Sequence, residues 1–280
     1  MYSLKPDLLL AEEPWYHTLA SSPPLPPIVD LRPWAGPTHN QRFQDCTGYG
    51  TAHFREWWSI RFGQPYVELS PLFIYNEERS REHTLNQDSG ARPRDAAWTL
   101  TNLGICPEAD FPEDPANLFT LPPASAVAAA LPYKLDHAYR LAGIADLLHC
   151  LSTGYPAIIG MGITAEWELP QTLATGIIPL SPANAPLLGG HETLVIGYTL
   201  VPYQGIPANH LLIQGSWGAT GLQGEGFFAL PLTMANHWLW SAWTFRNADS
   251  PATLALSRDP AKSVAQKVTT PKKRVAKKAG

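Results

Sequence analysis

The sequence predicts an α+β fold in which a helical half precedes a half rich in β-strands. Between residues 46 and 104 apolar residues recur at helical spacing, and after about residue 133 short β-branched and apolar runs alternate with Gly, Pro and Asn. Runs of helices followed by runs of strands are typical of α+β proteins. A chain of 280 residues, 45% hydrophobic and 16% charged, is long enough to bury a substantial core.

Three helices are expected in the first half, over residues 46–62, 70–81 and 95–103. Gly63 and Gly104 end the first and the third, and Ser70 with Pro71 forms a favourable start for the second. The first helix carries apolar or aromatic residues around almost its whole circumference, so we expect it to be buried on most faces.

The second half is expected to form an antiparallel sheet or barrel. A helix over residues 144–151 precedes five strands, at 157–161, 193–198, 210–214, 226–229 and 242–245. A short strand is also expected at residues 29–31, directly after a proline-rich run. We therefore divide the chain into an extended arm (1–28), a helical domain (29–132), a β-rich domain (133–250) and a disordered tail (251–280).

The C-terminal tail differs in charge from the rest of the chain. The net charge is −4, but residues 261–280 carry seven Lys or Arg and no acid, so residues 1–260 carry −11. The basic tail is either a solubilising end or a tether for nucleic acid or an acidic partner. The residues that would make such a tether are Lys272, Lys273, Arg274, Lys277 and Lys278.

The N-terminal sequence has too short an apolar run for a signal peptide, and no stretch is long enough to cross a membrane. The three cysteines are odd in number and far apart, which favours a reducing compartment over a disulfide framework. We expect a cytoplasmic or virion-associated protein with no membrane partner. No residues show metal-ligand spacing or a phosphate loop, so neither a metal nor a cofactor is expected.

Cys46 and His191 are the candidate catalytic residues. A cysteine at a helix N-terminus lies near unsatisfied N–H groups and a partial positive charge, which favour its thiolate. His191 follows two glycines and leads into an apolar strand, 145 residues after Cys46, as in proteins whose Cys–His pair meets only in the fold. Taken alone, each residue also fits an ordinary structural role.

Five blocks of sequence resemble the papain-like (C1) cysteine peptidases, and most closely their bacterial and viral members. In chain order they are VDLRPWAGPTHNQRFQDCTGYG, ELSPLFIYNEERS, QDSGARPRDAAWTLTNLGICPE, GGHETLVIGY and HLLIQGSWGATGLQGEGFFALP, within residues 28–247. The resemblance implies a helical left domain and an antiparallel β-barrel right domain, with a cleft between them.

The resemblance also implies roles for single residues. Cys46 matches the nucleophile, His191 the general acid and base, and Gln41 the side chain that completes the oxyanion hole. Two further features match the substrate-binding part of the family's site: the segment that pairs with an extended substrate and the tryptophan that covers the catalytic histidine. They are Asp88, Ser89, Gly90 and Trp217.

The sequence departs from the family pattern at three positions. Gly215 stands where the family has the asparagine that orients the histidine. Gln41 lies five residues before Cys46 where six are usual, so Gln44 is an alternative donor, and Asp45 places a carboxyl group next to the thiol.

Two functions stay open on this evidence. One is a thiol peptidase that cuts polypeptides with the Cys46–His191 pair, with activity reduced by Gly215 and controlled by location or partners, since no long inhibitory propeptide is evident. The other is a papain-fold component that binds without cutting, as part of a larger assembly such as a phage particle or a secretion machine, and is tethered by its basic tail.

Overall fold

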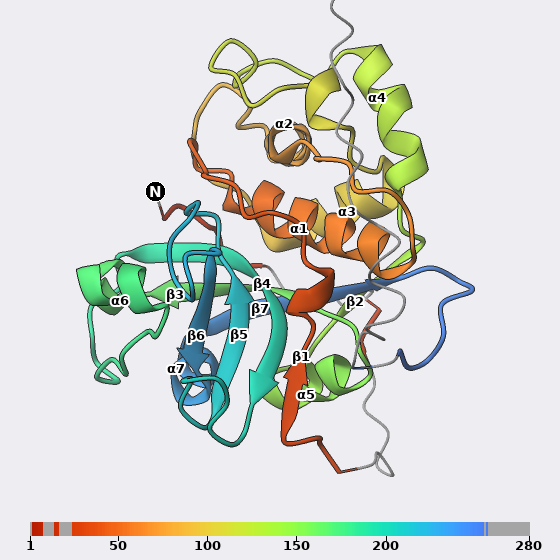
Figure 1. Ribbon diagram of the computed structural model, residues 1–280. Coiled ribbons are helices and arrows are strands. Elements are labelled where there is room, and N and C mark those ends of the chain that lie inside the picture. The colour runs from red at the N-terminus through yellow and green to blue at the C-terminus, as the bar shows by residue number, and fades with distance from the viewer. Residues whose placement is uncertain (1, 8–13, 17–23, 255, 257–280) are drawn as a thin grey trace, which may run out of the picture.

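The computed structural model describes residues 2–7, 14–16, 24–254 and 256. Helices gather on one side and a sheet on the other, and helix α1 (Cys46–Arg61) lies between them (Figure 1). The helical half is completed by α2 (Pro71–Arg81), α3 (Pro93–Asn102) and α4 (Ala124–Ala130). The helices that accompany the sheet are α5 (Ile144–Ser152), α6 (Pro170–Thr175) and α7 (Leu232–Trp238).

Helix α1 is the centre of the molecule. All its residues from Cys46 to Ser59 are buried, as the apolar character of nearly every face predicted. It ends just before Gly63, whose φ of +73° lies in the left-handed region that a residue with a side chain rarely adopts. The N-terminus of α1, which begins with Cys46, lies at the junction between the helical half and the sheet.

The start of α2 shows how local sequence sets the helical half. Ser70 caps the helix by accepting a hydrogen bond at 3.1 Å from the backbone N–H of Phe73, and Pro71 occupies the first turn. Four short 3₁₀ helices connect the longer elements: η1 (Arg32–Trp34), η2 (Glu108–Asp110), η3 (Leu131–Tyr133) and η4 (Ala165–Glu168).

The sheet is antiparallel, with the order β2-β7-β3-β4-β5-β6. Its strands are β1 (Ile28–Asp30), β2 (His137–Arg140), β3 (Ala157–Ile163), β4 (Gly189–Thr199), β5 (His210–Gln214), β6 (Phe227–Pro231) and β7 (Leu239–Arg246). Strand β4 is central: one edge pairs with β5, and the other pairs first with β3 and then with β1. Strand β4, which contains His191, therefore has a hydrogen-bonded strand on each edge.

The expected barrel is an open sheet. In the part of the chain that the structure describes, β2 and β6 are the two ends of the strand order and do not pair with each other. Single bridges cover these edges instead, from Trp15 to Arg140 on β2 and from Ile177 to Ala229 on β6. Covering an edge in this way protects its unpaired backbone groups without closing the sheet.

Several short elements were not expected from the sequence, namely β2, α4, α6 and α7. Each has at most seven residues, too few for a clear periodic pattern. The basic tail and its five candidate contact residues lie outside the described residues. Among the helices that the structure describes, none is long and apolar enough to cross a membrane.

Candidate active site

Cys46 lies where α1 meets strand β4. The side chain is 1% exposed, and its sulfur contacts the backbone N–H of Glu192, the residue after His191. One turn further along α1, an added Cβ on Gly50 would lie 2.8 Å from Oε1 of Glu192. These contacts place the start of α1 beside strand β4, which carries His191, although His191 follows Cys46 by 145 residues in the sequence.

His191 is enclosed by aromatic rings. The indole of Trp217 stacks on the imidazole, with ring centroids 5.5 Å apart and an angle of 21° between the planes. Trp167 and Tyr2 meet the imidazole edge-on, at 6.4 and 5.9 Å. Aromatic rings thus surround the imidazole on several sides.

Nδ1 of His191 is buried and has no hydrogen-bond partner among the residues that the structure describes. An added Cβ on Gly215 would lie 3.0 Å from the Phe228 ring, which also contacts Trp217 with centroids 5.4 Å apart. An apolar ring therefore lies at the position from which an asparagine side chain would extend, and it can offer the imidazole no hydrogen bond.

Gln41 is held in one orientation by two hydrogen bonds. Its Oε1 accepts from the Ser216 hydroxyl at 2.8 Å, and its Nε2 donates to the Phe43 carbonyl at 2.8 Å. Since an amide nitrogen carries two hydrogens, one N–H remains for another acceptor. Gln44 has a different surrounding: its Oε1 accepts from the Ser3 hydroxyl at 2.8 Å.

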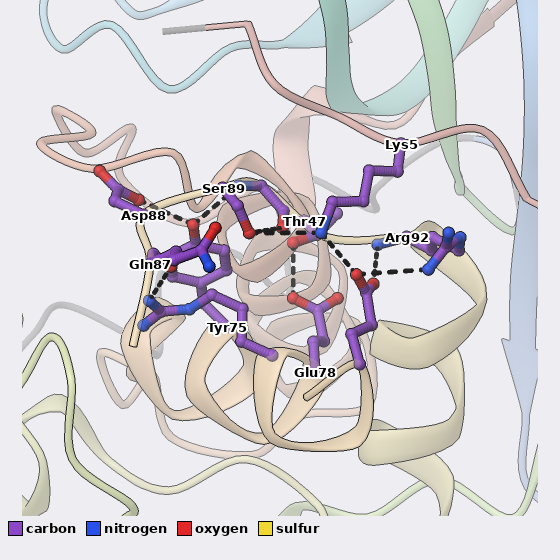
Figure 2. A network of polar contacts seen from close by, with 11 residues as sticks. Lys5, Thr47, Tyr75, Glu78, Gln87, Asp88, Ser89 and Arg92 are labelled. Carbon is purple, nitrogen blue, oxygen red and sulfur yellow. Dashed lines mark hydrogen bonds and ion pairs between the residues drawn. The ribbon is translucent and has the colours of Figure 1, made fainter. Parts of the chain in front are cut away.

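The segment from Asp88 to Gly90 is anchored to the helical half. Oδ1 of Asp88 accepts from the Tyr75 hydroxyl at 2.7 Å and from the backbone N–H of Gln44 at 3.0 Å. The same hydroxyl accepts from the backbone N–H of Gly90 at 2.9 Å. Tyr75 thus fixes the segment next to the residues that precede Cys46, as Figure 2 shows for Tyr75, Asp88 and Ser89.

The first residues of the chain, 2–7, lie between this segment and strand β4; we call them the arm segment. Gly190 exchanges two hydrogen bonds with it, from the Leu4 N–H to its carbonyl and from its own N–H to the Tyr2 carbonyl, both at 3.1 Å. On the opposite side the Lys5 N–H donates to the Ala91 carbonyl at 3.0 Å. The expected cleft is therefore filled by the chain itself.

Close approach of the arm segment requires glycine at its walls. An added Cβ on Gly90 would lie 2.0 Å from the carbonyl oxygen of Ser3, and one on Gly189 would lie 2.0 Å from that of Tyr2. Gly90 also has a φ of +66°, a conformation that favours glycine independently of the contact. The pair of glycines thus lets another backbone lie against both halves of the molecule.

Lys5 fastens the arm segment to the helical half. Its Nζ lies 2.6 Å from Oε2 of Glu82. Figure 2 shows the same Nζ reaching Ser89, whose Oγ is 3.3 Å away. The Glu82 side chain is only 4% exposed and also pairs with Arg92 at 3.3 Å. A charge-assisted bond to a carboxylate with so little solvent is stronger than an exposed surface pair.

Burial of the site favours the uncharged forms of its titratable side chains. Burial raises the pKa of the Cys46 thiol, and the carboxyl group of Glu192 adds to this rise. Burial also lowers the pKa of His191 to about 4. Asp45 is fully buried, and burial together with the Glu113 charge raises its pKa well above the usual range. With the arm segment in place, these shifts favour a thiol at Cys46 and a neutral imidazole at His191 at pH 7.

Two features of the site were missed by sequence reasoning. Glu192 carries a carboxyl group in an otherwise apolar strand, and that charge was a visible signal. The return of residues 2–7 to the site had no such signal, since it depends on contacts with residues about 90 and 190 positions away. In the described part of the chain, no three His, Cys, Asp or Glu side chains form a group that could hold a metal ion.

Comparison with known proteins gives one relative by sequence. An uncharacterized peptidase C1-like protein of Acanthamoeba polyphaga mimivirus is 27% identical over 172 residues, which cover 58% of this chain and 53% of that protein. The chain thus spans about half the length of this relative. No protein-family model matches the chain.

Solved structures show the same fold. Xylellain, a cysteine protease from Xylella fastidiosa, is 29% identical, with a TM-score of 0.76 over 88% of this chain and 96% of that one. Digestive procathepsin L 3 of Tenebrio molitor is 17% identical, with a TM-score of 0.63 over 84% and 75%. A cysteine protease of Carica candamarcensis in complex with E-64 is 19% identical, with a TM-score of 0.58 over 80% and 99%. The two lower identities support the fold alone.

Proposed function

We propose that this chain, which has the fold and the sequence pattern of the papain-like (C1) cysteine peptidases, is itself a cysteine peptidase that uses Cys46 and His191. The observation that carries the proposal is the position of Cys46 at the N-terminus of α1, which packs against β4 so that Gly50 lies against the side chain of Glu192, the residue after His191. A nucleophile at a helix N-terminus beside a histidine is the arrangement that acyl transfer through a thioester requires.

The reaction would run in two acyl-transfer steps. His191 takes the Cys46 proton while the sulfur attacks the peptide carbonyl carbon, and the same proton then passes to the leaving amine as the C–N bond breaks. Water next attacks the thioester, loses a proton to His191 and releases the acid, and that proton returns to the sulfur. No metal or redox partner is needed for this balance.

Gln41 is the better candidate for the oxyanion hole. Its amide is fixed by Ser216 and Phe43, and its second N–H can donate to a developing oxyanion together with the Cys46 backbone N–H. A donor that is already oriented loses little entropy when charge develops. Gln44 instead serves the arm segment, through Ser3.

A substrate polypeptide would take the place of the arm segment. The backbone groups that now bind Leu4 and Lys5, the carbonyls of Gly190 and Ala91, are the groups an extended substrate would pair with. Asp88, Ser89 and Gly90 would support that edge. The arm segment must therefore leave before a substrate can enter, which supplies a control that the sequence expectation of location or partners did not include.

Gly215 supports a reduced rate rather than a loss of function. Nδ1 of His191 has no hydrogen-bond partner in the described structure, and the ring stacks on Trp217, so no side chain at position 215 helps to orient it. No observation favours the alternative of a component that binds without cutting. Binding of nucleic acid by the basic tail stays a prediction from the sequence.

The test is labelling of the full chain by a peptidyl epoxide, followed by mass spectrometry and assay of a peptide library. We expect one adduct on Cys46, loss of adduct and turnover in Cys46→Ala, and loss of turnover in His191→Ala. Cys106→Ala is the matched control, because Cys106 is also a buried free cysteine. Labelling that persists in Cys46→Ala, or a folded protein that neither reacts nor cuts, would falsify the proposal.

A further inference from the structure

Glu192 is a buried carboxyl group without a partner. It is 1% exposed, and neither of its carboxyl oxygens has a hydrogen-bond partner in the described residues. Burial, with a contribution from the charge of Asp7, raises its pKa well above the usual range. The other titratable groups that interact with it, Glu78 and Cys46, are not cations either. An unpaired buried carboxyl group is costly, and its presence beside the site calls for a reason.

Strand pairing shows where the side chain of Glu192 lies. Glu192 on β4 pairs with Gly160 on β3, and Gly160 pairs with Ser241 on β7. Residues directly opposite one another in antiparallel strands point to the same face of the sheet. Glu192, Gly160 and Ser241 therefore form a row across one face, with the glycine in the middle.

Leu4 of the arm segment packs over this row. An added Cβ on Gly160 would lie 2.8 Å from Cδ2 of Leu4, 2.8 Å from Oγ of Ser241 and 3.0 Å from Cγ of Pro93. Leu4 is itself only 5% exposed. The row is thus the floor of a pocket with Pro93 at its wall, and Leu4 fills it; we call it the Leu4 pocket.

The chemistry of the Leu4 pocket does not match leucine. The Ser241 hydroxyl on this row is buried without a hydrogen-bond partner in the described structure, as is the Glu192 carboxyl group, whose Oε1 faces Gly50 of α1. Leucine can pair with neither. A lysine side chain continues two atoms beyond the Cδ position where leucine ends, and its ammonium group could meet a carboxylate and a hydroxyl.

We propose that the Leu4 pocket selects a basic side chain of the substrate polypeptide, with Glu192 as its counter-ion and Ser241 as a second acceptor. That the bound polypeptide is a substrate rests on the proposed peptidase function. The affinity of the pocket for a cation depends on the fold and not on catalysis. Leucine in the arm segment leaves the carboxyl group unpaired, so the arm segment is an occupant that a basic polypeptide displaces.

The first test uses stability, because it does not depend on catalysis. In the full chain, Leu4→Lys is combined with Glu192→Gln in a double-mutant cycle followed by thermal unfolding. We expect Leu4→Lys to lower Tm by at least about 5 °C more in the Glu192→Gln background than in wild type, since removing one partner strands a buried charge. Leu4→Met is the uncharged control and should show no such coupling.

The second test uses peptides that differ only by Lys, Arg, Leu or Glu at one position, each position being tried in turn. We expect basic peptides to exceed leucine peptides in kcat/KM, and Glu192→Gln to lower that ratio by about 30-fold. Equal Tm losses in both backgrounds, or an unchanged ratio, overturn the pocket proposal. A coupling in Tm with no turnover of any peptide would refute the peptidase and leave the pocket standing.

Discussion

At the residue scale, the Cys46–His191 pair depends on what surrounds it more than on the two residues themselves. Burial shifts both pKa values toward the neutral forms, while Trp217 holds the imidazole in place. Nδ1 of His191 has no hydrogen-bond partner in the described structure, and Phe228 lies against the backbone of Gly215. If the pair is catalytic as proposed, its reactivity is set by solvent access and by orientation of the ring.

Replacement of Gly215 tests the orientation argument. Gly215→Asn alone should not raise kcat/KM, because its Cβ would lie 3.0 Å from the Phe228 ring. Combined with Phe228→Leu, the same change should raise kcat/KM by about 10-fold or more, since an amide then has space to hold the imidazole. Phe228→Leu alone is the control. A double variant no faster than that control would contradict this account.

The depressed pKa of His191 predicts a pH-dependent stability. The unfolded imidazole takes up a proton near pH 6.5, whereas the buried one does so only near pH 4. The neutral ring therefore favours folding above pH 6.5, and this advantage is lost as pH falls toward 4. The free energy of unfolding of wild type should drop relative to His191→Asn by up to about 3 kcal/mol over that range.

Urea unfolding of both proteins at pH 7, 6, 5 and 4 measures this difference. Titration of the other groups is common to wild type and variant, so it cancels in the comparison. Parallel curves across the whole range would mean that His191 is already accessible to protons in the folded state.

At the element scale, the arm segment is the part of the chain that decides access to the site. It pairs with Gly190 on β4 and with Ala91 in the helical half, so it belongs to both halves at once. Lys5 fastens the arm segment to the helical half through Glu82, and Asp7 pairs with Arg140 on β2 at 3.8 Å.

Reversing the charge of Lys5 should therefore open the site. Lys5→Glu replaces the contact with Glu82 by repulsion, and we expect the rate of epoxide labelling at Cys46 to rise about 10-fold. Lys134→Glu makes the same change of net charge at an exposed position remote from the arm segment and should leave the rate unchanged. Equal rates in the two variants would show that the arm segment does not limit access.

At the scale of the whole molecule, the charge pattern separates the tail from the folded body. Residues 1–260 carry −11 and residues 261–280 carry +7, so a polyanion would be repelled by one part and attracted by the other. The catalytic proposal does not use the tail, and peptidase activity should be the same with and without it.

Deletion of residues 261–280 tests the tail by itself. If the tail binds nucleic acid, the full chain should bind single-stranded DNA with a log–log salt slope of up to about −5, and the 1–260 chain should not bind. The same two proteins should cut peptides at equal rates. Retention of DNA binding by the shorter chain would remove the tail from that role.

The sequence by itself determined the order of the longer helices and of most strands, the helix that starts at Cys46 and the strand into which His191 leads. These features depend on local signals: the cap at Ser70, the stop at Gly63 and the apolar runs that became β3 to β7. Such signals act within a few residues, so these elements can be predicted from a single sequence before the tertiary structure is known.

Only the tertiary structure decided that the sheet stays open, that residues 2–7 fill the site, and that Glu192 lies buried in the row of residues whose Gly160 is covered by Leu4. Each outcome depends on contacts between residues that are far apart in the chain. Which backbone fills a space, and which carboxyl group loses its water, follows from packing, because burial is a property of the assembled core and not of any single segment.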